Sequence, residues 1–381
     1  MRIVYVHIGM HKTGTTAIQA CMKGFDDGKT RYADELGHEN HSLPLYAGYS
    51  DREQTYSQFL SLGMNKEDIA RQKDQSLARI KQALASNKTD NLIFSGEDIA
   101  LIQRDGLLAF KQALATVFDR IMIVAFVRSP VDYLDSQLRQ VIKSGFNSPT
   151  IARPNYRNRF EKFIDLFGRE NVAFIPYDKN TDAYDSFCKV IGIEKRDLRV
   201  QKNQKLGLEA TKLVYLLNKI SSRFDKDSSI RAARNQFIDA VSHILQDREA
   251  IPAPLIEPLV DHDDLAWLLA NTDIDFPMPP YSHSAHFRMD SLDQFLSNPR
   301  QESVQKLADL LPRNEPVEPY LCDPMIAVTR SFIHLLQNRM RMIEQFDPTL
   351  YLDANPDLKA AGVNPYHHLL AHGLKEGRKL Q

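Results

Sequence analysis

The sequence predicts an α/β protein with a parallel β-sheet flanked by helices, a helical C-terminal half and a small helical tail module. Three observations support this fold class. Strand-like and helical segments alternate up to about residue 205, which is typical of a parallel sheet covered by helices on both faces. Beyond that point the strand-like runs stop. Near the C-terminus, three Asx-Pro pairs each indicate the start of a short helix.

The alternating half contains runs of β-branched and aromatic residues that are suited to buried strands. Helical patterns lie between them, and Ser129-Pro130 places an N-cap residue before a proline at the first helical position. Residues 25–65 look irregular. The expected strands are 3–8, 91–95, 120–127 and 172–175, and the expected helices are 17–22, 67–86, 106–117, 130 onward, 157–167 and 182–191.

The C-terminal half is expected to be helical at 207–220, 228–247, 255–270 and 325–345, with a Pro-rich break at 276–280. The pairs Asp347-Pro348, Asn355-Pro356 and Asn364-Pro365 predict three short helices that end near Gly373. These patterns predict one large domain, a connecting helix and a tail. The expected bounds are 1–325 for the large domain (an α/β core of about 1–205 and a helical part of about 206–325), 326–345 for the helix and 346–381 for the tail.

The composition limits the classes of partner. The 48 Lys and Arg residues nearly balance the 49 Asp and Glu residues, so no overall field attracts nucleic acid or an anionic membrane. The three cysteines are widely spaced and indicate neither a disulfide framework nor a zinc site. No leader or transmembrane segment is apparent. We expect a cytoplasmic protein of bacterial or cytosolic type, and its oligomeric state and any peripheral attachment to the inner membrane stay open.

The most specific motif is the loop between the first strand and the first helix. It reads Gly9-Met10-His11-Lys12-Thr13-Gly14-Thr15-Thr16. Glycines let several backbone N–H groups point at one anion, and the helix N-terminus adds a positive partial charge. In the nucleoside-triphosphatase loop the lysine follows the second glycine, whereas Lys12 precedes Gly14. Arg128, and no acidic residue for magnesium, follows the strand 120–127.

The order of strand, Lys12-Thr13-Gly14-Thr15-Thr16 loop and helix resembles the 5′-phosphosulfate-binding loop of sulfotransferases, which have a P-loop-like fold. The segment 124–145 resembles the family's 3′-phosphate-binding segment, with Arg128 at a strand end and Ser136 eight residues later. The resemblance implies 3′-phosphoadenosine 5′-phosphosulfate as co-substrate and no metal. The residues that it implies for donor binding are His11, Lys12, Thr13, Gly14, Thr15, Thr16, Arg128 and Ser136. A strand–helix turn with a surface Arg128 is the alternative.

Sulfuryl transfer to a hydroxyl needs positive charge at the leaving phosphate and a base for the nucleophile. Lys12 suits the first role. Glu97, which follows the strand 91–95, is the closest match to the base of several carbohydrate sulfotransferases, and a helix-start acid is its alternative role. His41 is a second candidate, because cytosolic small-molecule sulfotransferases use a histidine. Its alternative role is that of a polar loop residue.

The tail resembles short repeat modules that accompany bacterial surface-polysaccharide glycosyltransferases, although a plain capping subdomain is an equal alternative. This resemblance directs the expectation toward a carbohydrate or glycolipid acceptor. Two other functions stay open. A P-loop kinase for a small molecule would require magnesium, and a nucleotide-binding scaffold without catalysis would bind adenosine 3′,5′-bisphosphate without turnover.

Overall fold

The structure is a computed structural model. It describes the chain except for residues 53–55, 149–152, 179, 198–205, 224, 280–288, 312–320, 345, 370–377 and 379–381. The chain divides into two compact units. The first comprises Met1–Gln137, Ile151–Lys205 and Ile251–Phe287, and the second comprises Leu138–Thr150, Leu206–Ala250 and Arg288–Gln381. The division into a large domain, a connecting helix and a tail remains a prediction.

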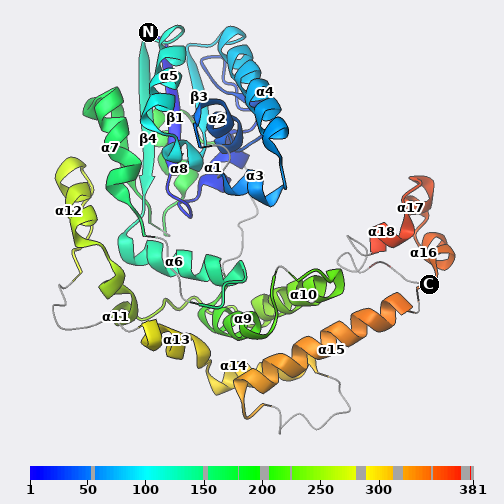
Figure 1. The fold of residues 1–381 in the computed structure, drawn as a ribbon. Helices are drawn as coiled ribbons and strands as arrows, with labels where there is room; N and C mark the ends of the chain where they lie inside the picture. The colour runs from blue at the N-terminus through cyan, green and yellow to red at the C-terminus, as the bar shows by residue number, and fades with distance from the viewer. Residues whose placement is uncertain are drawn as a thin grey trace. The chain divides into compact units, whose positions relative to one another are not determined.

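A five-stranded, all-parallel sheet forms the centre of the first unit, which confirms the predicted α/β class (Figure 1). The strand order is β2-β3-β1-β4-β5, so β1 lies in the middle. Four of the strands were predicted, and β2 was missed because it is only three residues long. The strands are β1 (Ile3–Gly9), β2 (Thr30–Tyr32), β3 (Asn91–Ser95), β4 (Arg120–Val127) and β5 (Val172–Pro176).

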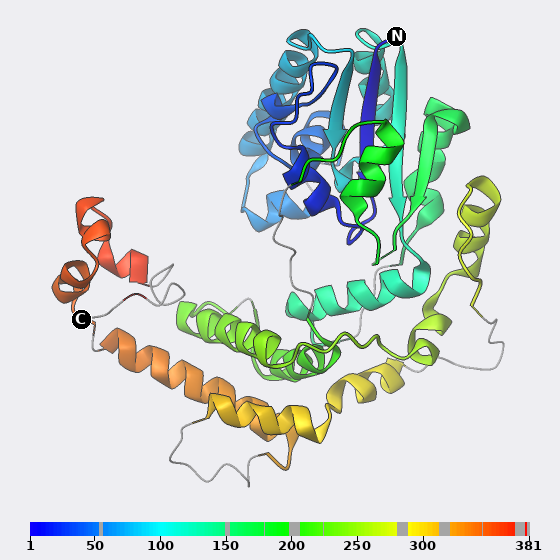
Figure 2. The same ribbon diagram turned by 180° about the vertical axis from the view of Figure 1, so that it is seen from behind.

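Helices cover both faces of this sheet (Figures 1 and 2). On one face, α1 (Thr15–Met22) and α8 (Ala183–Ile191) pack in a shared apolar cluster with strand residues such as Phe126. On the other face, α5 (Arg104–Ala115) and α7 (Tyr156–Phe167) pack against β4. Because the sheet is covered on both sides, the central strands β1, β3 and β4 are largely apolar and do not alternate with solvent-facing polar residues.

The expectation that residues 25–65 are irregular was wrong. Besides β2, they contain a 3₁₀-helix and the helices α2 (Ser42–Tyr49) and α3 (Ser57–Ser61). Helix α2 packs against α4 (Lys66–Ala85), and most of its residues are buried. Its composition has little helix propensity, so burial against α4 and not local preference stabilises it.

Two further expected helices differ in how closely the structure matches them. Helix α6 (Pro130–Lys143) begins where the Ser129-Pro130 pair predicts. The expected helix 255–270 is divided into α11 (Ala253–Ile256), a 3₁₀ turn and α12 (His262–Asn271). Asp261 accepts a hydrogen bond from the backbone N–H of Asp264 and thereby starts α12 separately.

The second unit is helical in the described part of the chain. The expected helices α9 (Leu208–Ile220), α10 (Ser228–Ile244) and α15 (Pro324–Glu344) are present, and α9 packs against both of the others. Two helices that were not predicted, α13 (Met289–Ser297) and α14 (Gln301–Gln305), also pack on α9.

The tail contains three short helices, as the Asx-Pro pairs predict. They are α16 (Pro348–Ala354), α17 (Pro356–Ala360) and α18 (Pro365–His368). A small apolar core of Tyr351, Leu358 and Leu369 holds them together. The predicted end near Gly373 lies outside the described residues.

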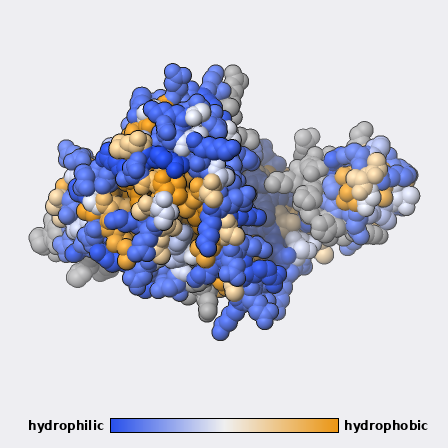
Figure 3. Space-filling model, turned by 90° about the horizontal axis from the view of Figure 1, so that it is seen from above, coloured by the Kyte–Doolittle hydropathy of each residue, from blue (hydrophilic) through white to orange (hydrophobic). Residues whose placement is uncertain are grey.

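No helix in the described ranges is long and apolar enough to cross a membrane. Hydrophilic residues cover most of the face that Figure 3 presents, and hydrophobic residues gather in patches between them.

Candidate anion-binding and acid–base site

The candidate site lies where three neighbouring strands end. In the sheet, His7 of β1 is opposite Ser95 of β3, and Gly9 is opposite Phe126 of β4. The loop after β1, Glu97 after β3 and Arg128 after β4 therefore come to the same edge. Helix α1, which follows β1, covers one face of the sheet, and α5, the next α-helix after β3, covers the other. Open α/β sheets bind ligands at this kind of switch point.

The loop after β1 is curled by two residues with left-handed backbone, Lys12 (φ 68°) and Gly14 (φ 79°). A side chain at Gly14 would place its Cβ 2.6 Å from that of Ala183. A Cβ at Gly9 would lie 2.9 Å from the Thr13 hydroxyl oxygen and 2.8 Å from that of Thr15. Both glycines are therefore required by the close packing of the loop, as the sequence motif implies.

The polar side chains of the loop divide into two groups. Thr13 and Thr15 are buried, and the Thr13 hydroxyl donates a 2.7 Å hydrogen bond to the Met10 carbonyl. Lys12 and Thr16 are exposed. Helix α1 begins at Thr15, where the first N–H groups of a helix lack intrahelical acceptors. The buried threonines thus shape the loop, and the loop presents an ammonium group, a hydroxyl and a helix N-terminus to an anion.

Arg128 is only 7% exposed, so it is not the surface residue of the alternative interpretation. Its Nη1 donates a 2.9 Å hydrogen bond to the Lys12 carbonyl, and its guanidinium lies 5.4 Å from the centre of the Tyr177 ring. Its own carbonyl accepts a hydrogen bond from the Tyr156 hydroxyl. Burial lowers the pKa of Arg128, and Nε is buried without a partner among the described residues. An anion beside the loop would satisfy this donor.

Ser136 lies on α6, seven residues beyond Ser129, which is close to two helical turns. The two serines therefore share one side of the helix. Ser136 is 6% exposed and belongs, like Arg128, to the first unit. Arg128 and Ser136, the two residues singled out in the second predicted phosphate-binding segment, are thus both buried.

Glu97 and Asp98 form an acid pair, and His11 of the loop lies against both. The Nδ1 atom of His11 is 3.5 Å from a Glu97 oxygen, and its Nε2 atom is 3.5 Å from an Asp98 oxygen. Burial opposes the ionisation of Glu97, but its hydrogen bonds with His11 and Thr15 and the charge of His11 hold its pKa below the usual value. Glu97 is therefore ionised at neutral pH and lies beside the loop that follows β1.

Asp98 is buried in a different environment. Its Oδ2 accepts a 2.5 Å hydrogen bond from the Tyr56 hydroxyl, and its backbone N–H donates to the Ser42 hydroxyl. Burial, with the charge of Glu97, raises the pKa of Asp98 against the opposing effects of His11 and Tyr56. Two adjacent carboxyl groups whose pKa values are displaced in opposite directions are typical of acid–base sites. Asp98 and Tyr56 were not predicted, although Asp98 directly follows a predicted site residue.

His41 is fully buried at the N-terminus of α2. Its Nδ1 accepts a 3.1 Å hydrogen bond from the Ser95 N–H, and its ring stacks on Tyr32. Burial lowers the pKa of His41 to about 3, and the charge of His38 contributes. This is the environment of a neutral histidine within a core, and the irregular loop expected to carry it is instead the start of α2.

His7 of β1 is a second buried histidine that the sequence analysis did not single out. Burial lowers its pKa to about 4, although the charge of Glu97 opposes this shift. Its Nδ1 is 2.7 Å from the Ser95 hydroxyl, and its Nε2 has no partner among the described residues. Its position within an otherwise apolar strand was the available signal.

No family model matches the chain, and no curated protein matches it. Within the described part of the chain, no group of three or more His, Cys, Asp or Glu side chains is arranged to hold a metal ion.

Proposed function

We propose that the protein is a sulfotransferase that moves a sulfuryl group from 3′-phosphoadenosine 5′-phosphosulfate to a hydroxyl of a carbohydrate or glycolipid. The observation that carries this proposal is the hydrogen bond from Arg128 to the Lys12 carbonyl. It joins the two segments that resemble the family's phosphate-binding elements, which are 116 residues apart in the chain. Both segments contribute cationic side chains to one edge of the sheet.

Donor binding would use groups that are already oriented. The curled loop and the N-terminus of α1 suit the 5′-phosphosulfate, and Arg128 with Ser136 suits the 3′-phosphate. The unpartnered Nε of buried Arg128 supports an anionic ligand at this point. A preorganised site of this kind needs little rearrangement when the donor binds.

In the transfer step the acceptor oxygen attacks sulfur, and the bond between sulfur and the bridging phosphate oxygen breaks. The phosphate leaves as adenosine 3′,5′-bisphosphate with the bond's electron pair, and Lys12 stabilises the charge that develops there. The acceptor proton passes to Glu97. Its lowered pKa keeps this carboxylate ionised and ready to accept the proton at neutral pH. His41 is less suited to this role because its side chain is fully buried.

Thermal unfolding with nucleotides tests the donor assignment. Adenosine 3′,5′-bisphosphate should stabilise the protein in the presence of EDTA, by roughly 2.7 kcal/mol at about 100 times its Kd. Arg128→Ala should lose most of this gain, whereas Arg71→Ala, at an exposed position on α4, should keep it. Stabilisation by ATP with magnesium, and none by the bisphosphate, would support the kinase alternative. Binding of the bisphosphate without sulfuryl transfer to any acceptor would support the inactive scaffold.

A further inference from the structure

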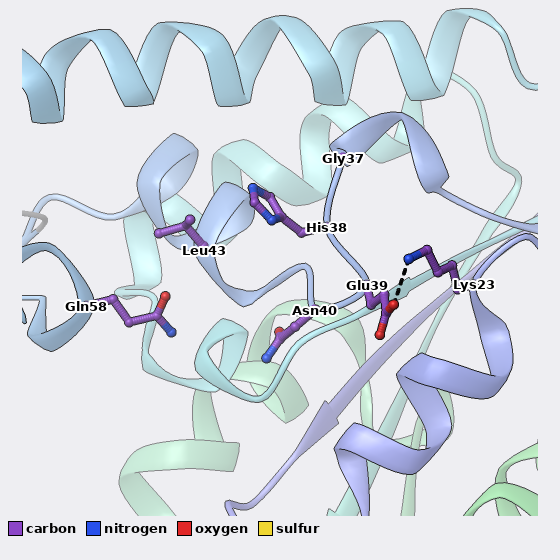
Figure 4. A pocket seen from close by; sticks show the side chains of 7 residues that line it. All are labelled: Lys23, Gly37, His38, Glu39, Asn40, Leu43 and Gln58. Atoms are coloured by element: carbon purple, nitrogen blue, oxygen red, sulfur yellow. Dashed lines mark hydrogen bonds and ion pairs between the residues drawn. The ribbon is translucent and has the colours of Figure 1, made fainter. Parts of the chain in front are cut away.

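A polar hollow of about 440 Å³ opens on the surface of the first unit (Figure 4). It lies among the end of α1, the segment before α2, and α3. In Figure 4, Gln58 enters from one side, Lys23 and Glu39 lie at the other, and Asn40 is between them. Its lining residues are Lys23, Gly37, His38, Glu39, Asn40, Leu43 and Gln58.

The hollow is connected to the acid pair by short contacts. The Gln58 side-chain amide donates a 3.5 Å hydrogen bond to Oδ2 of Asp98. The Asn40 side chain accepts a hydrogen bond from the Ser42 N–H, and the Ser42 hydroxyl accepts one from the Asp98 N–H. A Cβ at Gly96 would lie 2.5 Å from the Ser42 nitrogen, so glycine at this position lets the wall of the hollow pack beside Glu97.

The lining favours a particular ligand chemistry. Pockets for small molecules, typically about 300–1,000 Å³, are lined mainly by apolar side chains. Here Leu43 is the apolar side chain among amide, imidazole, ammonium and carboxylate groups. These groups can donate and accept hydrogen bonds, as a hydroxyl-rich molecule requires. Lys23 and Glu39 form a 2.7 Å ion pair, so their charges cancel and an uncharged ligand is favoured.

We propose that this hollow binds an uncharged sugar ring of the acceptor. The inference rests on the proposed sulfotransferase function and deepens it, because it narrows the carbohydrate acceptor to an uncharged sugar and assigns the residues that contact it. Asn40 and Gln58 would recognise sugar hydroxyls, and Leu43 would contact the less polar face of the ring. The contact of Gln58 with Asp98 would link acceptor binding to the acid–base pair.

Sugar binding to the protein saturated with adenosine 3′,5′-bisphosphate tests this assignment. The probes are the methyl glycosides of glucose, galactose, mannose, rhamnose and N-acetylglucosamine, with methyl glucuronide as the anionic comparison, followed by calorimetry or ligand-observed NMR. We expect at least one neutral glycoside to bind, and methyl glucuronide to bind at least tenfold more weakly.

Two variants locate the binding. Asn40→Asp keeps the oxygen that accepts from Ser42 but removes the amide donor, and Leu43→Trp fills the hollow. Each should weaken glycoside binding at least tenfold and leave bisphosphate affinity within twofold, which also shows that the variant is folded. Gln112→Ala, at an exposed position on α5, is the matched control and should change neither affinity.

The two proposals fail in different ways. If the wild-type protein does not bind the bisphosphate, the sulfotransferase function is wrong. If it binds the bisphosphate but none of the neutral glycosides, the acceptor assignment is overturned while the donor site stands. The acceptor assignment is also overturned if a glycoside binds equally well to wild type, Asn40→Asp and Leu43→Trp.

Discussion

Acidification from pH 8 to pH 5 should lower the free energy of unfolding of the first unit through His7 and His41. Burial lowers their pKa values in the folded protein to about 4 and about 3, whereas a histidine in an unfolded chain titrates near 6.5. The unfolded state therefore binds more protons in this range. The stabilising effect of the two neutral side chains is complete above pH 6.5 and is lost as the pH falls below it.

The size of the effect follows from proton linkage. At pH 5 the protonated form of a histidine in the unfolded chain outnumbers the neutral form by roughly 30 to 1. This protonation stabilises the unfolded state by about 2 kcal/mol per histidine. The folded pKa values of about 4 and about 3 lie below pH 5, so protonation of the folded state offsets little of this. Together the two histidines should remove about 4 kcal/mol. The raised pKa of Asp98 has the opposite effect, because it makes the folded state relatively more stable as the pH falls. A comparison of variants therefore tests the two histidines better than the total change in the free energy of unfolding does.

Urea unfolding between pH 5 and pH 8 measures this effect. Trp267, the one tryptophan of the chain, lies on α12 in the first unit. Its fluorescence therefore reports the unfolding of the first unit. His41→Asn keeps an acceptor for the Ser95 N–H and cannot titrate, so it should reduce the loss at pH 5 by about 2 kcal/mol. The control His243→Asn replaces an exposed histidine on α10 and should leave the pH dependence as in wild type. If His41→Asn has the pH dependence of wild type, the buried, neutral state of His41 is refuted and His41 becomes a candidate base again.

Three further predictions concern the donor site and the tail. Gly14→Ala should lower the free energy of unfolding by about 1–3 kcal/mol, because φ at this position is 79° and the new Cβ would meet Ala183. It should also lower bisphosphate affinity at least tenfold, measured by calorimetry, and normal binding would contradict the loop geometry. Arg128→Ala should mainly weaken donor binding, by roughly 1.5–3 kcal/mol, whereas Lys12→Ala should mainly lower kcat, by about 100-fold. If steady-state kinetics show the opposite pattern, the roles assigned to the two residues are reversed. Truncation before Phe346 should preserve bisphosphate binding, and its loss would show that the tail is part of the donor domain.

The fold class and most element boundaries were predictable because their signals are local. Runs of β-branched residues mark four of the five strands, and the residues around Ser129-Pro130 and the Asx-Pro pairs of the tail mark helix starts. Strand β2 lacked such a signal. Its three residues form a strand because they pair with residues 91–93 of β3, which are about sixty positions away in the chain.

The candidate site was predictable in part for the same reason. The spacing of Gly9, Lys12 and Gly14 reflects the backbone conformation of one loop, and Arg128 and Glu97 each directly follow a recognisable strand. That they come to one edge follows from the parallel sheet. Tyr56 could not be placed beside Asp98 from the sequence, because the two residues are 42 positions apart. They meet where Tyr56 stacks on Tyr46 of α2, which itself packs against residues 97–101.

The sequence by itself determined the α/β class, the helix starts, and the loop whose glycines and lysine suit an anion, because these depend on neighbouring residues. Only the tertiary structure decided the electrostatic state of the side chains around that loop. His41 was expected on an irregular loop, as a candidate base or as a polar loop residue, and is instead enclosed in a core. Glu97 and Asp98, adjacent in the chain, have pKa values displaced in opposite directions. Desolvation and charge proximity control these properties, and both depend on residues that the fold brings together from distant parts of the chain.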